Sequence, residues 1–237
     1  MKVTRLLPAE SPQFTLDFDS ADSMARLDGL YAVSKDEWLR INLVASINGN
    51  ATGADGTSAS LTVGADRRIL GAIRRNADVV LVGASSVRRE GYFLPKTAPL
   101  AIVTSTGDLS GHRIPTGVES GRVIVLCPPT AVDRLAETFP TSVTIIPLPG
   151  PSLQPRDIAG ALRDRGLARI VCEGGPRLAA QLVNDEIVDE LCLTMSPQLN
   201  GAMREVLPGL GKTKQTRLSQ LLIDSSDALY GRWTILN

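Results

Sequence analysis

The stretch IRRNADVVLVGASSV, residues Ile73 to Val87, decides the fold class of this chain. Its first part ends a segment in which apolar residues recur with the period of a helix. Its centre, VVLV, is a run of consecutive apolar residues of the kind found in strands buried on both faces. Gly83 and two serines end the run and predict a turn. A helix followed by a doubly buried strand predicts an α/β domain with a largely parallel sheet.

The same alternation extends along most of the chain. We expect strands at 39–46, 77–83, 99–105, 121–127, 142–148 and 167–173, and helices at 64–77, 130–139, 155–166 and 175–185. Three further strands, at 188–199, 216–226 and 228–237, follow without helices and predict antiparallel additions to one edge of a mixed, mainly parallel sheet flanked by helices. Residues 1–36 lack the alternation, so we expect an irregular N-terminal arm before a single domain at 37–237.

The composition excludes several classes of function. With 25 basic and 25 acidic residues the net charge is zero, so no global field attracts nucleic acid or an anionic membrane. No apolar stretch approaches the roughly 20 residues that span a bilayer, and the first residues lack a signal-peptide core, so we expect a cytosolic protein. His112 is the only histidine and the three cysteines are far apart, so we expect no metal site.

The candidate ligand-binding residues follow the expected strands. In open α/β sheets, ligands bind at the carboxyl ends of strands, where helix N-termini supply unpaired N–H groups. Glu173 ends one strand, and two glycines and Pro176 then begin a helix. The glycines permit close approach of a pyrophosphate, although a structural tight turn explains them equally well. Gly83 ends another strand, and Ser85 and Ser86 either suit a phosphate or simply cap a short helix.

Arginines accompany these strand ends. Arg88 and Arg89 follow the two serines, and their fork geometry suits a phosphate or a carboxylate. The expected helix at 64–77 carries four more arginines, for which a solvated face is the plainer interpretation. If one of the four reaches the site, Arg74 is best placed, because it lies just before the strand that ends at Gly83.

Several ordered motifs resemble the reductase family of riboflavin biosynthesis, which has a dihydrofolate reductase-like fold. The motifs are ASING at 45–49, SLT at 60–62, IRRNADVVLVGASSV at 73–87, EGG at 173–175, VDEL at 188–191 and SPQLNG at 196–201. The resemblance implies an oxidoreductase without a metal that forms homodimers. It would use NADPH to reduce the ribose of 5-amino-6-(5-phosphoribosylamino)uracil, or of a related pyrimidine, to the ribitylamino product.

The resemblance also implies roles for individual residues. Glu173 and Asn48 are the candidate catalytic residues: Glu173 would orient sugar hydroxyls or relay a proton, and Asn48 would only hydrogen-bond. The implied substrate-binding residues are Ser58, Arg74, Leu94 and Glu173. The implied NADPH-binding residues are Val44, Ala45, Ser46, Gly49, Ser60, Gly83, Ala84, Ser85, Ser86, Val87, Arg88, Glu90, Thr104, Ser105, Gly174, Gly175, Pro176, Arg177 and Leu178.

Three departures from the family pattern bear on the substrate. Asn48 stands where the family has an aspartate, Ser60 replaces a bulky tryptophan, and an acidic pair is reduced to Glu90 followed by Gly91. Three functions therefore stay open. They are reduction of an aminopyrimidine, reduction of a pterin such as dihydrofolate, and nucleotide binding without catalysis.

Overall fold

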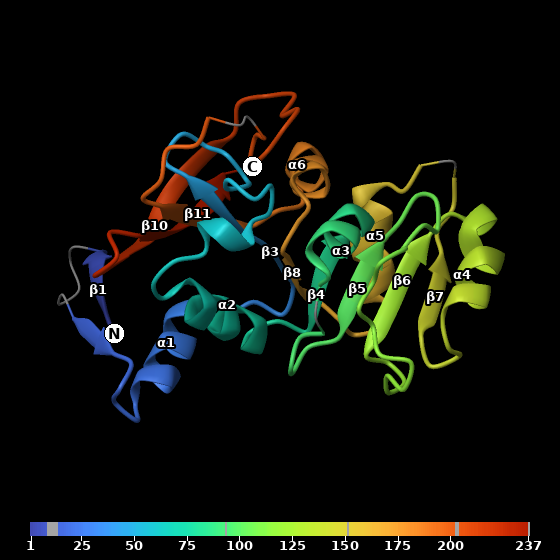
Figure 1. Cartoon of the computed structure of the whole chain (residues 1–237), viewed down its shortest axis with the longest axis horizontal. Coiled ribbons are helices and arrows are strands. Elements are labelled where there is room, and N and C mark those ends of the chain that lie inside the picture. The colour runs from blue at the N-terminus through green and yellow to red at the C-terminus, as the bar shows by residue number, and fades with distance from the viewer. Residues whose placement is uncertain (9–13, 93, 151, 202–203, 237) are drawn as a thin grey trace.

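A single mixed sheet runs through the molecule (Figure 1). The computed structural model describes residues 1–8, 14–92, 94–150, 152–201 and 204–236. Within these ranges, eleven strands pair in the order β2-β1-β10-β11-β9-β3-β8-β4-β5-β6-β7. The strands are β1 (Lys2–Leu7), β2 (Thr15–Asp17), β3 (Trp38–Ser46), β4 (Val79–Gly83), β5 (Leu100–Val103), β6 (Val123–Cys127), β7 (Thr144–Pro147), β8 (Arg169–Cys172), β9 (Glu190–Ser196), β10 (Gln215–Asp224) and β11 (Leu229–Leu236). The helices are α1 (Ser23–Tyr31), α2 (Asp66–Arg75), α3 (Ala84–Glu90), α4 (Val132–Thr138), α5 (Pro155–Arg163) and α6 (Pro176–Asn184), with short 3-10 turns at Ala59–Leu61 and Pro129–Ala131.

The half of the sheet from β3 to β7 is parallel, as the alternation of strands and helices predicts. Val79, Val80, Leu81 and Val82 of β4 are all 0% exposed, which explains their consecutive apolar character. The predicted α/β class with a mainly parallel sheet is confirmed.

Helices cover both faces of this sheet. One hydrophobic core contains side chains of α1, α2, α3 and α4, including Leu27, Ile73 and Leu135. The other core contains side chains of α5 and α6, including Ile158 and Leu182. With both faces covered, the carboxyl ends of the parallel strands are where a ligand can reach the sheet.

The three C-terminal strands differ in part from the expectation. β10 and β11 are antiparallel to their neighbours, but β9 is parallel to β3, with Ile41 opposite Leu191. The expectation was wrong for β9 because α6 serves as a crossover that returns the chain in the same direction as β8. These strands are also not at the edge of the sheet, since β1 pairs with β10 and the outermost described strands are β2 and β7.

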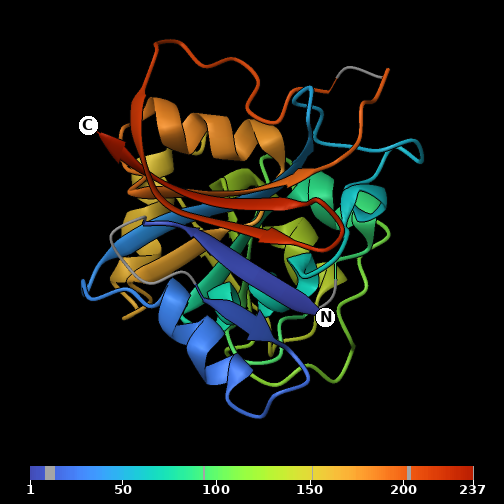
Figure 2. The same cartoon turned by 90° about the vertical axis from the view of Figure 1, so that its left-hand side faces the viewer.

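The N-terminal segment is more ordered than expected. Residues 1–36 were predicted to be irregular, yet they contain β1, β2 and α1. β1 pairs antiparallel with β10, placing Val3 opposite Asp224, and Figure 2 shows the dark blue β1 alongside the red β10. The prediction of an irregular arm is wrong because β1 is held by a partner that lies far along the chain, and only Val3 in it is buried.

A buried ionic cluster fixes α1 against the sheet. Glu190 of β9 accepts hydrogen bonds from Arg40 of β3 and from Arg232 of β11, the latter at 2.7 Å. Arg40 also donates to the carbonyl of Tyr31 at the end of α1, at 3.0 Å. Burial alone would raise the pKa of the Glu190 carboxyl, but Arg40 and Arg232 hold that pKa below its usual value.

No helix in the described ranges is both long enough and apolar enough to cross a membrane.

Candidate active site

Two cavities adjoin one another at the carboxyl ends of β3, β8 and β4. The first, which we call the inner cavity, has a volume of about 150 Å³. The second, the outer cavity, has a volume of about 430 Å³. Gly175 and Pro176 line both, so the segment after β8 is their common wall. The inner cavity is lined by Asn42, Leu43, Val44, Ala51, Ser58, Thr62, Asp66, Leu70, Arg74, Ser86, Glu90, Tyr92, Glu173, Gly174, Gly175 and Pro176. The outer cavity is lined by Gly83, Ser85, Arg89, Gly175, Pro176, Arg177, Leu178, Arg204, Glu205 and Pro208.

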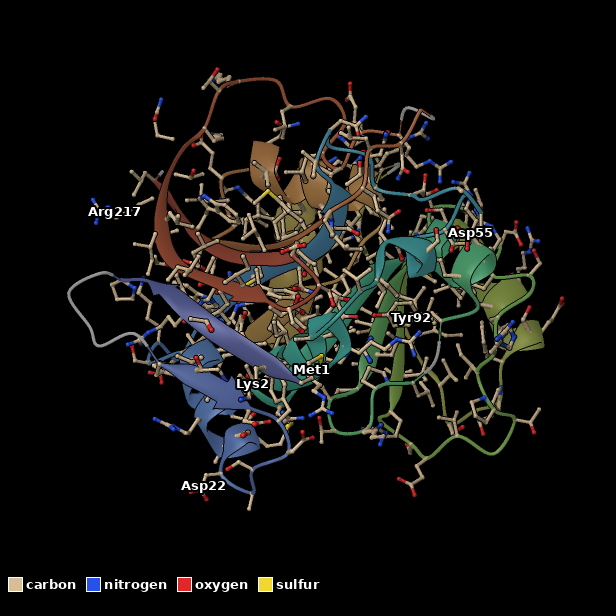
Figure 3. The ribbon with its side chains drawn as sticks, turned by 60° about the vertical axis from the view of Figure 1, so that its left-hand side comes forward. Met1, Lys2, Asp22, Asp55, Tyr92 and Arg217 are labelled. Carbon is tan, nitrogen blue, oxygen red and sulfur yellow. The ribbon has the colours of Figure 1, made fainter. Side chains whose placement is uncertain are left out.

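Three hydrogen bonds hold the Glu173 side chain in the wall of the inner cavity. Its side chain is 5% exposed. Arg74 donates to it through Nε to Oε1 at 2.8 Å and through Nη2 to Oε2 at 2.6 Å. The hydroxyl of Tyr92 donates to Oε2 as well, and the same hydroxyl accepts a hydrogen bond from Arg74 Nη2 at 2.8 Å. Figure 3 shows Tyr92 beside α2, which carries Arg74.

The position of Arg74 depends on how α2 is anchored. The backbone N–H of Ala65, just before the helix, donates to Asp224 Oδ2 at 2.8 Å and to the Tyr230 hydroxyl at 2.9 Å. Tyr230 in turn donates to Asp224 Oδ2 at 2.6 Å. Strands β10 and β11 thus fix the helix that carries Arg74 into the inner cavity.

Two opposing effects act on the pKa of Glu173. Burial raises the pKa of the Glu173 carboxyl, although the contacts with Arg74 act in the opposite direction. For Arg74, burial opposes the charge, but the contacts with Glu173 outweigh it and raise the guanidinium pKa. A carboxyl of raised pKa that touches a phenol is suited to hold a proton and to pass it on.

A second carboxyl with a shifted pKa lines the same cavity. Asp66, at the start of α2, accepts a hydrogen bond from the Thr194 hydroxyl at 2.6 Å. Burial raises the pKa of the Asp66 carboxyl, against the hydrogen bonds from Thr194 and Thr62. Glu90 also lines the cavity and accepts a hydrogen bond from Ser58 at 2.9 Å.

The outer cavity has the opposite charge character. Arg89, Arg177 and Arg204 line it together with the single carboxylate Glu205. It also contains the N-terminus of α6, whose first turn has no side-chain cap, so backbone N–H groups are available to an anion. Among the described residues, no ion pair involves Arg89 or Arg177.

Gly175 allows the close approach of backbone at the wall between the cavities. A Cβ at this position would lie 3.1 Å from Ser86 Oγ and 3.3 Å from Ser85 Oγ. The N–H of Gly83 donates to the carbonyl of Gly174 at 2.8 Å, which ties the end of β4 to the end of β8. The residues at this junction have the donor set and the narrow backbone that a nucleotide diphosphate requires.

The structure brings about half of the predicted site residues to these cavities. Val44, Ser58, Arg74, Ser86, Glu90, Glu173 and Gly174 line the inner cavity; Gly83, Ser85, Arg177 and Leu178 line the outer cavity; Gly175 and Pro176 line both. Neither cavity is lined by Ala45, Ser46, Asn48, Gly49, Ser60, Ala84, Val87, Arg88, Leu94, Thr104 or Ser105.

Asn48 joins two loops rather than facing a cavity. Its Oδ1 accepts hydrogen bonds from Ser46 Oγ at 2.7 Å and from the Asn200 N–H at 3.1 Å. Its Nδ2 donates to the Asn200 carbonyl at 2.8 Å. Only an amide can accept and donate in this way, which gives a physical reason for asparagine where the family has aspartate.

Other predicted residues outside the cavities also have structural partners. Arg88 donates to the carbonyl of Asp108 at 2.6 Å, and the hydroxyl of Thr104 accepts the N–H of Gly107 at 3.1 Å. Ser60 donates to Asp55 at 2.6 Å, and Leu94 packs against the hydrophobic core. Arg89, one residue after Arg88, is the arginine of this turn that lines the outer cavity.

Tyr92, Asp66 and Arg204 are the main site residues that the sequence did not indicate. Tyr92 and Arg204 lie in loops without a helix or strand pattern, so nothing local indicated their position. Asp66 carried one usable signal, since it begins a helix that precedes a buried strand and follows a loop rich in small polar residues.

The fold is that of pyrimidine reductase-like proteins. A pyrimidine reductase-like protein from Corynebacterium diphtheriae superposes with a TM-score of 0.73 at 20% identity, covering 89% of this chain and 99% of that one. The deaminase/5-amino-6-(5-phosphoribosylamino)uracil reductase of Thermotoga maritima gives 0.67 at 19% identity, covering 84% of this chain and 57% of that longer one. The riboflavin biosynthesis reductase of Saccharomyces cerevisiae gives 0.68 at 14% identity, covering 89% and 95%.

The sequence itself matches the family model of the RibD C-terminal domain over residues 37–230. The chain therefore belongs to the RibD C-terminal domain family, and the class of protein is a riboflavin-type reductase. A search of the curated proteins found no significant match to this sequence. In the part of the chain that the structure describes, no group of three or more His, Cys, Asp or Glu side chains could hold a metal ion.

Proposed function

We propose that this protein is an NADPH-dependent reductase of the riboflavin-biosynthesis type. It would reduce the ribose of 5-amino-6-(5-phosphoribosylamino)uracil, or of a related aminopyrimidine, to a ribitylamino product. The observation that carries the proposal is the pair of adjoining cavities at the carboxyl ends of β3, β8 and β4. One contains buried carboxyls of raised pKa and the other contains arginines and a free helix N-terminus.

The outer cavity fits the phosphates of a dinucleotide. The uncapped N–H groups of α6 and the guanidinium of Arg177 suit a pyrophosphate, and Arg89 and Arg204 suit the additional 2′-phosphate that distinguishes NADPH from NADH. The dinucleotide supplies the hydride when bound, so the protein has to orient the substrate and manage the proton.

Glu173 is the residue to which we assign the proton. Its carboxyl has a raised pKa, lies in the cavity wall and touches the Tyr92 hydroxyl. Arg74 holds both partners in place through its Nη2 group. In this arrangement Glu173 orients substrate hydroxyls or delivers a proton, and Tyr92 completes the path along which that proton moves. We propose that Asn48 acts by positioning, through its clamp on Asn200, instead of by touching the substrate.

The test is reduction of the substrate by the purified chain. We expect NADPH absorbance to fall when 5-amino-6-(5-phosphoribosylamino)uracil is added, and the ribitylamino product to appear in equal amount. Binding of NADPH without oxidation across a panel of pyrimidines and pterins would instead support a protein that binds nucleotide without catalysis.

A second candidate substrate is a pterin such as dihydrofolate, and Asp66 is the observation that favours it. A carboxyl that is held by Thr194 and faces the inner cavity can pair with the amino and ring N–H groups of a diamino heterocycle. Parallel assays with dihydrofolate and with the aminopyrimidine would separate the two, because both consume NADPH but give different products.

We also propose that the enzyme works in the cytosol as a homodimer, and sedimentation velocity would test its assembly. β10 is not available for an edge-to-edge contact in such a dimer, because β1 pairs with it.

A further inference from the structure

Two loops at the carboxyl ends of β3 and β9 are joined to each other by hydrogen bonds. We call them the β3 loop (residues 47–53) and the β9 loop (residues 197–201 and 204–206). The N–H of Val206, for example, donates to the carbonyl of Gly49 at 3.1 Å. Figure 2 shows the light blue segment that follows β3 beside the orange segment that follows β9. The position of the β9 loop therefore depends on the β3 loop.

Asn50 holds the β9 loop at two points through its side chain. The residue is 0% exposed. Its Nδ2 donates to the carbonyl of Asn200 at 2.9 Å, and its Oδ1 accepts the N–H of Arg204 at 2.8 Å. The N–H of Ala51 also donates to the carbonyl of Arg204, at 2.7 Å. An amide is suited to this position because it donates from one atom and accepts at the other.

The main chain of Arg204 is thus fixed, while its side chain is left to a ligand. The side chain is exposed and lines the outer cavity together with Arg89 and Arg177. Among the described residues, its guanidinium forms no ion pair. The place of this charge in the outer cavity therefore depends on where Asn50 and Ala51 hold the backbone.

The next residue carries the opposite charge, which makes the register of the β9 loop important. Glu205 forms an antiparallel bridge with Asn50 and also lines the outer cavity. Because side chains alternate in direction along an extended chain, a slip of one residue would set a carboxylate where the Arg204 guanidinium lies. A carboxylate there would repel an anionic ligand. Asn50 opposes the slip, because a slip would break both of its side-chain contacts at once.

We propose that Asn50 is a positioning residue for the cofactor. It holds the β9 loop in the register that places the Arg204 guanidinium, and not the Glu205 carboxylate, against a phosphate of the dinucleotide. Asn50 itself lines neither cavity. The proposal rests on the proposed function only in taking the ligand of the outer cavity to be a dinucleotide. The affinity for that ligand is then set in part by an uncharged, buried side chain of another loop.

The experiment is a double-mutant cycle on the Kd for NADPH, measured by fluorescence titration at two salt concentrations. The proteins are the wild type, Asn50→Ala, Arg204→Gln and the double variant, each checked for its fold by circular dichroism. The control is Asn184→Ala, which removes the same kind of contact from a later part of the connection between β9 and β10. Asn184 Nδ2 donates to the Gly209 carbonyl at 3.0 Å, and its Oδ1 accepts the Gly211 N–H at 3.0 Å.

We expect Arg204→Gln to raise the Kd about tenfold, the size usual for a lost hydrogen bond to a charged group. Asn50→Ala should raise the Kd nearly as much, and the double variant should not exceed the larger single effect, because both changes remove one shared contact. Asn50→Ala should also weaken the salt dependence of the Kd as Arg204→Gln does, although it removes no charge. Asn184→Ala should change neither the Kd nor its salt dependence.

Effects that multiply in the double variant would overturn the proposal. So would an unchanged Kd in Arg204→Gln, a salt dependence that Asn50→Ala leaves as in the wild type, or an equal loss of affinity in Asn184→Ala. If Asn50→Ala does not fold, Asn50→Ser takes its place with the same expected results, since its shorter side chain also loses the two amide contacts.

Failure of the proposed function looks different. A wild type that binds NADPH but oxidises it with no substrate contradicts the proposed function alone, because the cycle measures binding and not turnover. A wild type that does not bind NADPH overturns both.

Discussion

The inner and outer cavities share Gly175 and Pro176 but hold their charges in different ways. The charged groups of the inner cavity are held by partners: Glu173 by Arg74 and Tyr92, and Asp66 by Thr194. The arginines of the outer cavity stand at its surface, and the turn of α6 beside them is uncapped. Charged groups that are buried and fixed by hydrogen bonds are suited to stabilising charge at one reacting atom. Charged groups that are exposed to solvent are suited to binding an anion. Mutations in the inner cavity should therefore change kcat, and mutations in the outer cavity should change the Kd for NADPH.

The largest effect is expected for Glu173→Gln in the inner cavity. The amide keeps the shape of the side chain but cannot donate a carboxyl proton, so kcat should fall by about 10² or more, the range usual for a lost acid–base group. The fall should be measured as initial rates of NADPH oxidation at saturating substrate, with circular dichroism to show an intact fold. Tyr92→Phe is the matched variant and should lower kcat less, because the carboxyl remains. An unchanged kcat in Glu173→Gln would remove this residue from the chemistry.

The next largest effect is expected in the outer cavity. Arg89→Gln/Arg177→Gln should raise the Kd for NADPH by about tenfold, since it removes two charged donors from a phosphate site, and should leave kcat nearly unchanged. The loss should shrink as salt rises, because exposed charges are screened. Fluorescence titration with NADPH and with NADH at two salt concentrations measures both effects. Arg165→Gln, at an exposed site after α5, is the control. A fall in kcat instead of affinity would contradict the division between the cavities.

Asn48 lies outside both cavities, and its variants test whether it takes part in the chemistry. Asn48→Asp removes the donor to the Asn200 carbonyl and sets a carboxylate against that oxygen, so the free energy of unfolding should fall by about 1 kcal/mol. We expect kcat to change by less than about threefold, well below a lost acid–base group. Urea unfolding and initial rates measure the two quantities. If Asn48→Ala lowers kcat as much as Glu173→Gln does, Asn48 belongs to the chemistry and not to the clamp.

The smallest effect concerns how stability depends on pH. Burial raises the pKa of both Asp66 and Glu173 above their values in the unfolded chain. The folded state therefore binds more protons than the unfolded state, and each group makes the free energy of unfolding fall as pH rises from about 4, the unfolded value, through the raised folded pKa. Asp66→Asn should remove one such contribution, so its stability should decline less than that of the wild type between pH 4 and pH 7.

Asp55 gives the matched control for this pH dependence. Hydrogen bonds from Ser60 and Thr57 lower the pKa of its carboxyl, so its contribution to stability has the opposite sign. Because that contribution changes only below about pH 4, the unfolded value, Asp55→Asn should leave the decline between pH 4 and pH 7 parallel to that of the wild type. Parallel pH profiles for Asp66→Asn and the wild type would contradict a buried, destabilised carboxyl in the inner cavity.

The parts of the fold that the sequence predicts are those with local causes. β4 and α2 follow from apolar periodicity within one short stretch, and their bounds lie within the expected ranges. β1 and the direction of β9 could not be predicted in this way. The first depends on a pairing with β10, and the second on which neighbour the chain reaches after α6. Such pairings are set by packing between distant segments and leave little local pattern.

The same distinction between local and long-range causes applies to the site residues. Glu173, Arg74, Ser58 and Glu90 were expected in the site and line the inner cavity. Tyr92 was not expected there, because its role depends on the position of its loop beside α2, which the sequence does not show. Arg88 and Arg89 were indistinguishable in sequence, and only the direction of the short helix α3 decides which one lines the outer cavity. Strand ends thus indicate where a site forms, but the fold selects its members.

The pairing of β1 with β10 also bears on how the chain folds. β4 pairs with β5, β5 with β6 and β6 with β7, so this half of the sheet can close through short crossovers. The opposite half includes pairings between segments that are far apart in the sequence, such as that of Val3 with Asp224. Closing long loops costs more chain entropy and slows folding, so the sheet has the topology to grow from β4–β7 outward. β1, which is made before the other described strands, is then among the last of them to pair.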